Sequence, residues 1–204
     1  MIVGVMAVQG DFSEHLAILK TLNVKTQEVR LPKDLEDIDG LIIPGGESTT
    51  LRKLFDIYGL TIAIKRYAKA GGPIWGTCAG MILMAQTLTN DRPEPLNLMN
   101  ITVTRNAYGR QLDSFEAAIP ISVIEGSPIP AVFIRAPSFT YIGENVEVIG
   151  KLNDGTPVAV KQGNMLATAF HPELTNDVRF HNFFLSLIKY KDNPSVPRNE
   201  CKDL

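Results

Sequence analysis

The sequence predicts an α/β protein with three layers, in which a mostly parallel central sheet lies between helices on both faces. Strand and helix patterns alternate over residues 1–88, which is typical of βαβ units. Several short runs, such as residues 2–8, are apolar throughout, as in strands buried on both faces. Turn dipeptides separate short β-branched segments over residues 101–170, which favours additional antiparallel strands in the middle of the chain.

The first part of the chain is expected to supply the parallel strands and the helices between them. Residues 12–22 repeat apolar side chains at helical spacing, and Asp11 with Glu14 has the pattern of a capping box that would start this helix. The expected strands cover residues 2–8, 24–29, 40–44 and 73–77. The expected helices cover residues 12–22, 50–58, 60–70 and 79–88.

The second part of the chain is expected to form short strands and one closing helix. Residues 90–100 contain prolines and no periodicity, so we expect a loop there. The expected strands cover residues 101–104, 119–124, 132–134, 146–152, 158–161 and 165–170, and the expected helix covers residues 176–191. Without an internal repeat, the sequence predicts one domain over residues 1–191 and a flexible tail over residues 192–204.

The composition excludes several classes of function. The 204 residues include 20 Lys and Arg against 22 Asp and Glu, so no basic surface for nucleic acid is expected. No apolar run approaches the ~18 residues of a membrane span, and residues 1–8 are too short for a secretory signal. The two cysteines, Cys78 and Cys201, cannot form a disulfide framework. We therefore expect a cytoplasmic globular protein without a membrane segment.

The segment 76–80 (GTCAG) places a cysteine between two glycines where a predicted strand meets a predicted helix. This is the layout of a nucleophile elbow, in which a tight turn lifts the central side chain above the sheet. The N-terminus of the following helix favours negative charge on the sulfur of Cys78, and the N–H of Ala79 is free to bind an oxyanion. The alternative is a buried structural cysteine between packing glycines.

A thiolate nucleophile needs a base, and the chain offers three histidines. His15 falls in the first predicted helix, and His181 falls in the last, where we expect a surface or packing role. His171 follows a predicted strand at the edge where open α/β sheets bind ligands. On an extended chain stiffened by Pro172, Glu173 would lie on the same side as His171 and orient its ring. The alternative is a His-Pro turn that caps the last helix.

The segment 44–49 (PGGEST) again lies where a predicted strand gives way to a helix. Glycines here let backbone N–H groups approach a ligand, but the G-x-x-x-x-G-K pattern of a phosphate loop is absent. One interpretation is a capped helix start, with Ser48 or Thr49 as the N-cap. The interpretation that joins this segment to Cys78 is a second oxyanion donor, the N–H of Gly46 beside that of Ala79.

With these three motifs in place, the chain resembles the class I (triad) glutamine amidotransferases, and within them the glutaminase subunits of pyridoxal 5′-phosphate synthases. The elbow and the His-Pro-Glu segment are shared across the whole family, whereas other segments point to the vitamin B6 branch. The matching segments are residues 7–10 (AVQG), 14–15 (EH), 41–50 (LIIPGGESTT), 76–80 (GTCAG), 105–106 (RN), 109–111 (GRQ), 113–116 (DSFE), 134–137 (IRAP) and 170–174 (FHPEL). The resemblance covers about residues 1–190 and implies a flavodoxin-like sheet.

The resemblance implies hydrolysis of L-glutamine to L-glutamate and ammonia, with no cofactor and no metal. Cys78 would attack the side-chain amide, His171 would relay the proton to the departing ammonia, and Glu173 would hold His171. Water would then cleave the γ-glutamyl thioester. The implied substrate site consists of Gly46, Glu47, Ser48, Arg105, Ile134 and Arg135. An arginine can clamp the α-carboxylate of a free amino acid, but the sequence does not choose between Arg105 and Arg135.

The resemblance also implies a partner that receives the ammonia, because ammonia protonated by water ceases to be a nucleophile. In the family this partner is a separate synthase subunit, a (β/α)8 barrel that combines ammonia with a pentose phosphate and a triose phosphate in a large hetero-oligomer. Docking activates the glutaminase through a backbone rearrangement at the position of Gln9 and Gly10. We therefore expect an oxyanion hole that is incomplete in the free chain.

Three alternatives remain at this point. An α/β protein with a cysteine elbow of the deglycase, peptidase or chaperone kind would have a reactive Cys78 without dependence on His171 and Glu173. A glutaminase of another amidotransferase pathway would share the whole triad. A binding subunit that retains the fold without catalysis would not need the complete triad, and its preservation argues against that function.

Overall fold

The computed structural model describes residues 1–90, 92–105 and 114–191 of the chain. Its main feature is a seven-stranded sheet with the strand order β10-β11-β12-β4-β3-β1-β2. These strands are β1 (Ile2–Met6), β2 (Lys25–Val29), β3 (Gly40–Ile43), β4 (Ile74–Thr77), β10 (Glu147–Lys151), β11 (Pro157–Gln162) and β12 (Met165–Thr168). Five neighbours, from β12 to β2, pair in parallel, while β11 and β10 extend one edge in antiparallel pairing. The expected tail, residues 192–204, lies outside the described residues.

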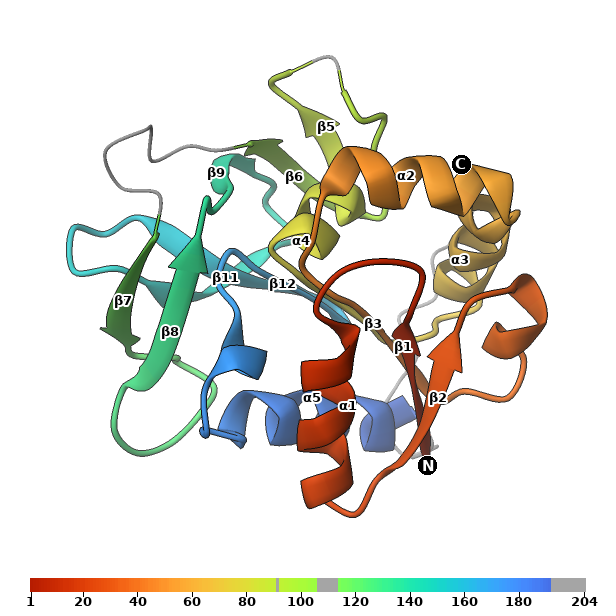
Figure 1. Cartoon of the computed structure of the whole chain (residues 1–204). Coiled ribbons are helices and arrows are strands. Elements are labelled where there is room, and N and C mark those ends of the chain that lie inside the picture. The colour runs from red at the N-terminus through yellow and green to blue at the C-terminus, as the bar shows by residue number, and fades with distance from the viewer. Residues whose placement is uncertain (91, 106–113, 192–204) are drawn as a thin grey trace.

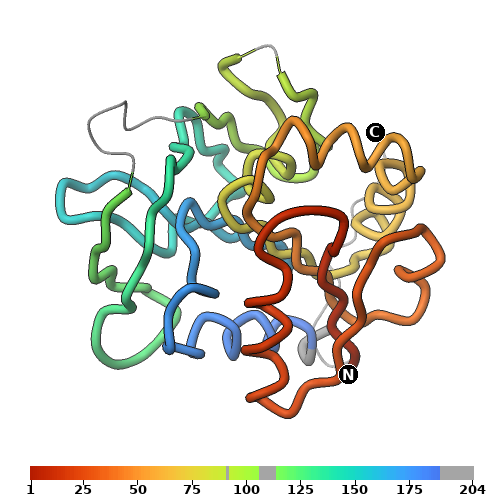
Figure 2. Tube along the Cα trace, viewed as in Figure 1, coloured from red at the N-terminus to blue at the C-terminus, as the bar shows by residue number. Residues whose placement is uncertain are grey.

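Helices cover both faces of this sheet (Figure 1), as the alternating pattern of the first part predicts. The helices are α1 (Phe12–Thr21), α2 (Ser48–Ile57), α3 (Leu60–Lys69), α4 (Ala79–Met84) and α5 (Arg179–Lys191), with the 3₁₀ helices η1 (Pro32–Leu35) and η2 (Pro172–Leu174). The first and last helices, α1 and α5, lie side by side although they come from opposite ends of the chain (Figure 2). The fold is therefore the predicted three-layer α/β arrangement.

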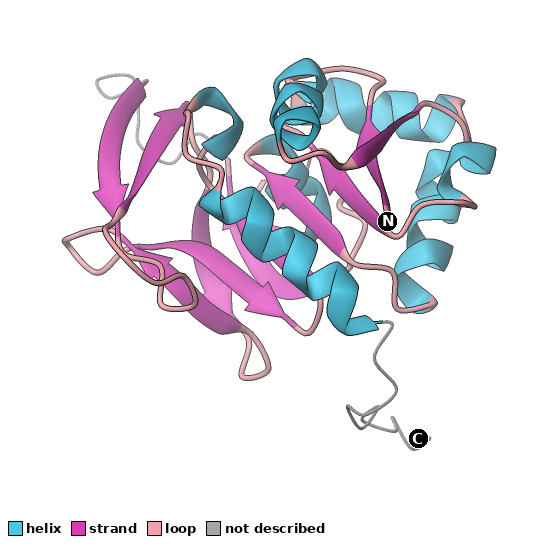
Figure 3. Ribbon diagram, turned by 90° about the horizontal axis from the view of Figure 1, so that it is seen from below, coloured by secondary structure: helices cyan, strands magenta, loops and turns pink. Residues whose placement is uncertain are grey.

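The middle of the chain forms two smaller sheets beside the main one (Figure 3). One contains β5 (Ala85–Leu88), β6 (Met99–Thr104) and β9 (Ser138–Ile142), and the other is the hairpin of β7 (Ser114–Ile119) and β8 (Ile129–Ile134). A single hydrophobic cluster of buried side chains includes residues from the main sheet and from both smaller sheets. The antiparallel strands therefore share a core with the parallel part.

Two of the predicted elements are wrong in this middle region. The helix expected over residues 79–88 ends at Met84, because the next four residues form β5, in which Thr87 pairs with Thr102 of β6 and their hydroxyl groups hydrogen-bond at 2.8 Å. The strand expected over residues 119–124 does not form. The strand there, β7, covers Ser114–Ile119, and Pro120 has no N–H to continue its ladder. Only Ile121 continues, as an isolated bridge to Gly150.

Other differences are smaller. Strand β6 begins at Met99, inside the loop expected over residues 90–100, and β9 was not predicted. Helix α5 begins at Arg179 rather than at residue 176, since the side chain and N–H of Arg179 both bind Asp177 ahead of the first turn. The turns at residues 154–155 and 162–164 join antiparallel strands as predicted.

The parallel strands matter most for the site because four of them end at one edge. The segments that follow β12, β4, β3 and β1, which are consecutive neighbours in the sheet, contain His171, Cys78, Gly46 and Gln9 respectively. In open α/β sheets the carboxyl ends of the strands are where ligands bind. The register pairs Thr168 directly with Thr77, so the segments with His171 and Cys78 leave the sheet side by side.

Candidate active site

Cys78 occupies a strained turn between β4 and α4. Its φ of 46° and ψ of −100° lie outside the regions that a residue with a side chain normally adopts. A Cβ on Gly80 would lie 2.0 Å from the carbonyl oxygen of Ile43, and a Cβ on Gly76 would lie 2.5 Å from the backbone of Gly80. The two glycines therefore allow the close backbone contacts that hold the elbow, as the sequence pattern predicts.

The sulfur of Cys78 lies between the imidazole of His171 and the end of β8. The thiol lies close enough to the imidazole to raise the pKa of His171, and Sγ donates to the carbonyl oxygen of Ile134 at 3.9 Å. Ala79 follows as the first residue of α4, so its N–H is among the helix-terminal donors that have no partner within the helix. The predicted cysteine and histidine are therefore brought together.

Glu173 completes this row of groups. Its Oε1 lies 2.7 Å from Nδ1 of His171, and its side chain is fully buried. The backbone N–H of His171 donates to the carbonyl oxygen of Val132 at 2.8 Å, which fixes the chain just after β12. The contact between His171 and Glu173 was expected on an extended chain, but Glu173 lies in η2, which begins directly after His171.

Asp11 adds a second carboxylate beside His171, although its sequence pattern predicts a helix cap. It precedes α1 but makes no side-chain capping bond, so the predicted capping box is wrong. Its Oδ2 instead lies 3.5 Å from Nδ1 of His171. The loop after β1 thus brings Asp11 to the same edge of the sheet as His171, and a negative charge near the imidazole replaces the expected helix cap.

Burial and neighbouring charges shift the ionisation of the pair. Burial disfavours the charged imidazole, but hydrogen bonds and charges from Cys78 and Glu173 outweigh it and raise the pKa of His171 to about 10. Burial also raises the pKa of Glu173, against the opposing effect of the His171 imidazole. The arrangement can therefore hold a proton on His171 at neutral pH, ready for transfer to a leaving group.

The same cluster is the one group of described residues with the spacing of a metal site. Ligand atoms of Asp11, His171 and Glu173 all lie within 4.8 Å of one another. Metal binding requires a lone pair on the imidazole nitrogen, but Nδ1 carries the proton that it shares with Oε1 of Glu173. The chemistry of this donor set therefore favours proton transfer over metal coordination.

A small cavity of about 40 Å³ opens beside Cys78. Its lining residues are Gly46, Glu47, Ser48, Cys78, Ile82, Arg105, Ile134 and Arg135. Six of them are the substrate-site residues that the family resemblance implies. Ile82 was not predicted, although it lies one turn after Cys78, the N-cap of α4, and its N–H donates to the Cys78 carbonyl oxygen at 3.1 Å.

An ion pair spans this cavity. Arg105 donates from Nη2 to Oε1 of Glu47 at 3.0 Å, and Glu47 is itself the N-cap of α2, accepting from the N–H of Thr49. Neither Ser48 nor Thr49 is the N-cap, so that interpretation is wrong: the longer Glu47 side chain folds back to the helix terminus instead. Arg135, which also lines the cavity, has a φ of 43°, which is another strained position.

The loop after β1 packs tightly on the glycine-rich loop after β3. Gln9 Oε1 accepts a hydrogen bond from the N–H of Glu47 at 3.0 Å, and the N–H of Asp11 donates to the carbonyl oxygen of Gly45 at 3.2 Å. A Cβ on Gly10 would lie 1.8 Å from that same carbonyl oxygen. The orientation of the Gly45–Gly46 peptide therefore depends directly on the Gln9-Gly10 segment.

The remaining histidines lie behind the site. His15 and His181 are both fully buried, and their rings are hydrogen-bonded between α1 and α5. His181 is therefore a packing residue and not a surface one. His15 Nε2 also lies 3.4 Å from Oε2 of Glu173.

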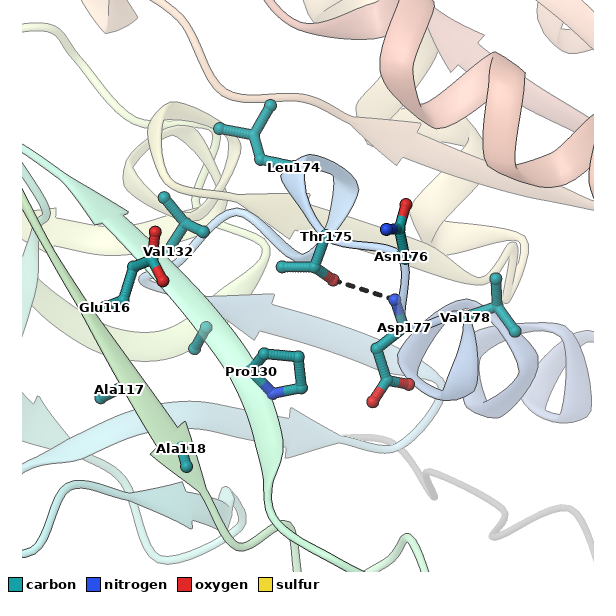
Figure 4. A pocket seen from close by; sticks show the side chains of 11 residues that line it. Glu116, Ala117, Ala118, Pro130, Val132, Leu174, Thr175, Asn176, Asp177 and Val178 are labelled. Carbon is teal, nitrogen blue, oxygen red and sulfur yellow. Dashed lines mark hydrogen bonds between the residues drawn. The ribbon is translucent and has the colours of Figure 1, made fainter.

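A larger hollow of about 910 Å³ lies elsewhere, between the β7–β8 hairpin and residues 174–178 (Figure 4). Side chains such as Pro130, Val132 and Leu174 line it, together with the carboxylates of Glu116 and Asp177. None of the described residues that line it is a cysteine or a histidine. The smaller cavity beside Cys78 is therefore the candidate reaction site.

A cysteine elbow at the edge of a parallel sheet, joined to a histidine and a glutamate, defines the class of triad glutamine amidotransferases. The chain belongs to the SNO glutamine amidotransferase family, whose profile matches residues 5–189. Among the described residues, no helix is both long and apolar enough to span a membrane.

Individual relatives agree with this assignment. The chain is 53% identical over 191 residues to a protein of Dehalococcoides mccartyi named pyridoxal 5′-phosphate synthase subunit PdxT, covering 93% of this chain and 98% of that protein. It is 52% identical over 190 residues to the protein of the same name from Chloroflexus aurantiacus, covering 92% of this chain and 100% of the relative.

Solved structures show the same fold. A crystal structure described as a glutamine amidotransferase superposes with a TM-score of 0.88 at 43% identity, covering 93% of this chain and 100% of that one. PurLQS from Thermotoga maritima superposes with a TM-score of 0.70 at 16% identity, covering 93% and 98%, which shows a shared fold alone.

Proposed function

We propose that this chain is the glutaminase subunit of a cytoplasmic pyridoxal 5′-phosphate synthase, which hydrolyses L-glutamine to L-glutamate and ammonia through Cys78, His171 and Glu173. The observation that carries the proposal is the continuous row of contacts from the thiol of Cys78 through His171 to Glu173. Curated relatives at about 50% identity over nearly the whole chain are named as subunits of that synthase.

In the first step, His171 takes the proton of the Cys78 thiol. The resulting thiolate sulfur bonds to the carbon of the substrate's side-chain amide, and the amide oxygen becomes an oxyanion. The N–H groups of Ala79 and Gly46 donate to this oxyanion. The protonated imidazole of His171 then gives its proton to the amide nitrogen, the carbon–nitrogen bond breaks, and ammonia departs. The enzyme is left as a γ-glutamyl thioester.

In the second step, neutral His171 takes a proton from water, and the hydroxide attacks the thioester carbon. The carbon–sulfur bond breaks, the thiolate of Cys78 is restored, and glutamate leaves. Glu173 keeps the imidazole in one orientation and stabilises its charged form in both steps. The 2.7 Å contact to Nδ1 leaves Nε2 as the nitrogen that faces the sulfur.

The polar walls of the small cavity suit the amino-acid end of the substrate. A guanidinium from Arg105 or Arg135 can bind the α-carboxylate, and the carboxylate of Glu47 can bind the α-ammonium group. The cavity of about 40 Å³ has room for roughly one water molecule rather than for glutamine. The cavity must therefore widen before glutamine can enter, and the Glu47–Arg105 ion pair lies at its wall.

This closed state supports activation by a partner. The partner is a synthase subunit with a (β/α)8 barrel, which accepts ammonia through a shielded route in a large hetero-oligomer. Its docking acts on the Gln9-Gly10 segment, which holds the Gly45–Gly46 peptide, and so completes the oxyanion hole. Ser48 and Ile134, at the wall of the cavity, complete the substrate site.

The test measures glutamate and ammonia released from glutamine with and without the synthase subunit. We expect a low rate from the free chain, a large increase in the complex, and no release above background from Cys78→Ala. Cys201→Ala, which changes the other cysteine, is the matched control and should retain the wild-type rate. Hydrolysis that survives in Cys78→Ala would overturn the mechanism, whereas full activity of the free chain would overturn activation alone.

A further inference from the structure

A buried polar network lies directly behind Glu173, on the side away from His171. The second carboxylate oxygen, Oε2, has no hydrogen-bond partner among the described residues, although the side chain is fully buried. His15 Nε2 lies 3.4 Å from it and at the same distance from the hydroxyl oxygen of Thr77. The carboxylate that orients the base is therefore contacted from behind by a second imidazole.

A third histidine supports His15 in turn. Nδ1 of His15 and Nε2 of His181 are 3.0 Å apart, so one of them donates to the other. Both rings pack edge-on against Trp75, at centroid distances of 5.5 and 4.9 Å, and both side chains have no exposed surface. All three histidines of the chain thus lie in one row with Glu173.

The hydrogen-bond pattern selects one direction of donation along this row. Nδ1 of His181 is buried and has no hydrogen-bond partner in the part of the chain that the structure describes. Burying an unpaired lone pair at that atom costs less free energy than burying an N–H that has no acceptor. The proton of His181 is therefore on Nε2. Nε2–H of His181 then donates to Nδ1 of His15, and the proton of His15 must lie on its own Nε2, toward Thr77 and Glu173.

The opposite direction of donation, from His15 to His181, is disfavoured at both histidines. A proton on Nδ1 of His15 would point the lone pair of Nε2 at the carboxylate oxygen 3.4 Å away, and it would leave the Nδ1–H of His181 buried without an acceptor. Both rings are also held neutral: burial, followed by the charges of His181 and His171, lowers the pKa of His15, and burial lowers the pKa of His181 to about 3.

We propose that His15 is a positioning residue for glutamine hydrolysis, which directs a neutral Nε2–H at the rear oxygen of Glu173, and that His181 sets the tautomer of His15. This inference rests on the proposed function and deepens it. The triad thereby becomes a five-residue row, from Cys78 through His171, Glu173 and His15 to His181.

The kinetic test uses His15→Gln, His15→Asn and His15→Leu in the complex with the synthase subunit. The amide nitrogen of glutamine can reach the place of Nε2, while asparagine is too short and leucine has no donor. We expect kcat to fall about tenfold to a hundredfold in His15→Asn and His15→Leu, with KM little changed, and largely to recover in His15→Gln. The acid limb of the pH profile should move to higher pH in the first two variants, since Glu173 loses the N–H dipole directed at its rear oxygen.

Phe184→Leu is the matched control, because Phe184 packs against the same Trp75 from α5 but has no hydrogen-bonding atom. It should lower the thermal unfolding midpoint without changing kcat or the pH profile. Equal kcat and equal pH profiles in His15→Gln and His15→Asn would overturn the inference. If wild-type complex hydrolyses no glutamine, the proposed function fails instead, so the two failures are distinguishable.

A second measurement needs no enzymatic activity. With only three histidines, ¹⁵N-histidine labelling gives three imidazole spin systems, assigned by their loss in His15→Gln and His181→Gln. At pH 7 we expect both His15 and His181 as the neutral Nε2–H tautomer. Either ring in the Nδ1–H form, or either ring protonated at that pH, would contradict the proposed direction of donation.

Discussion

The two sides of the candidate active site are built differently. On the rear side, Glu173 and His15 are fully buried and held by α1, β4, η2 and α5. On the front side, the Glu47–Arg105 ion pair lines a small cavity, and the side chains of Glu47 and Arg105 are 45% and 21% exposed. The groups proposed for proton transfer are thus enclosed, while the groups proposed for substrate binding lie in contact with solvent.

This difference indicates which groups of the site are held in position before substrate binds. Buried groups in fixed positions stabilise developing charge without reorganisation when the reaction occurs. An exposed ion pair contributes only about 0–1 kcal/mol, so it can open for substrate or on docking of a partner. Changes on the rear side should therefore act on kcat, and changes on the front side should act on KM.

Replacement of Glu173 is the most severe change on the rear side. Glu173→Gln keeps the size of the side chain but removes the charge that stabilises protonated His171. We expect kcat to fall by about 10²–10⁴-fold with a small change in KM. Steady-state glutamine hydrolysis in the complex with the synthase subunit measures both constants. A large rise in KM at unchanged kcat would contradict the division between the two sides.

Gly10 connects the two sides, because its loop holds the peptide before Gly46. Gly10→Ala would place a Cβ 1.8 Å from the carbonyl oxygen of Gly45 at a φ of 96°, so the backbone must shift. We expect kcat/KM to fall by at least about tenfold, as for other displaced catalytic groups.

Gly155→Ala is the matched control for Gly10→Ala. Gly155 has a similar φ of 88°, but nothing lies within 4 Å of its added Cβ. It should lose about 1 kcal/mol of stability from backbone strain and retain wild-type kcat/KM. Equal activities of the two variants would show that the contact with Gly45 is unimportant for the site.

Replacement of Arg105 tests the front side. Arg105→Ala removes the partner of Glu47 and one of two guanidinium groups at the cavity. We expect KM for glutamine to rise about tenfold to a hundredfold, because the substrate loses one charged hydrogen-bonding group. The change in kcat should be smaller. Arg30→Ala, at the exposed Glu28–Arg30 ion pair, is the control and should leave KM unchanged. A selective loss of kcat in Arg105→Ala would place Arg105 with the rear groups.

The sequence was sufficient to predict the parallel part of the fold. It also predicts that the loops after neighbouring parallel strands lie at one edge of the sheet. Continuous apolar runs show strands buried on both faces, and the carboxyl ends of neighbouring parallel strands lie at one edge, so Cys78 and His171 could be expected together. The elbow could be predicted because glycines are the only residues that allow the backbone contact between Gly80 and Ile43.

The middle strands and the rear network could not be predicted as well. The segment 85–88 becomes β5 only because β6, from another part of the chain, pairs with it, and such pairing overrides local propensity. The contact between His15 and His181 joins residues 166 positions apart, and neither lies in a recognisable motif for a polar network. Asp11 likewise precedes α1 as its pattern predicts, but its carboxylate lies near His171 and does not cap the helix.

The smallest expected effect concerns the neutral state of the rear side and is read from stability. Burial holds the pKa of His181 at about 3, below its unfolded value of about 6.5. As pH falls below 6.5, the unfolded chain therefore takes up a proton that the folded chain does not, and stability is lost as pH falls toward 3. His181→Gln removes this difference in proton uptake while keeping a donor toward His15.

Urea unfolding at pH 8, 7, 6 and 5 measures the effect. Below about pH 6, we expect the free energy of unfolding of the wild type to fall more steeply than that of His181→Gln, by up to about 1.4 kcal/mol per pH unit. Phe184→Leu, a packing change on the same helix, should lower the whole curve and keep the wild-type slope. Parallel curves for wild type and His181→Gln would mean that His181 is protonated in the folded chain. The enclosed side of the site would then tolerate charge as the exposed side does, and the contrast between the two sides would no longer hold.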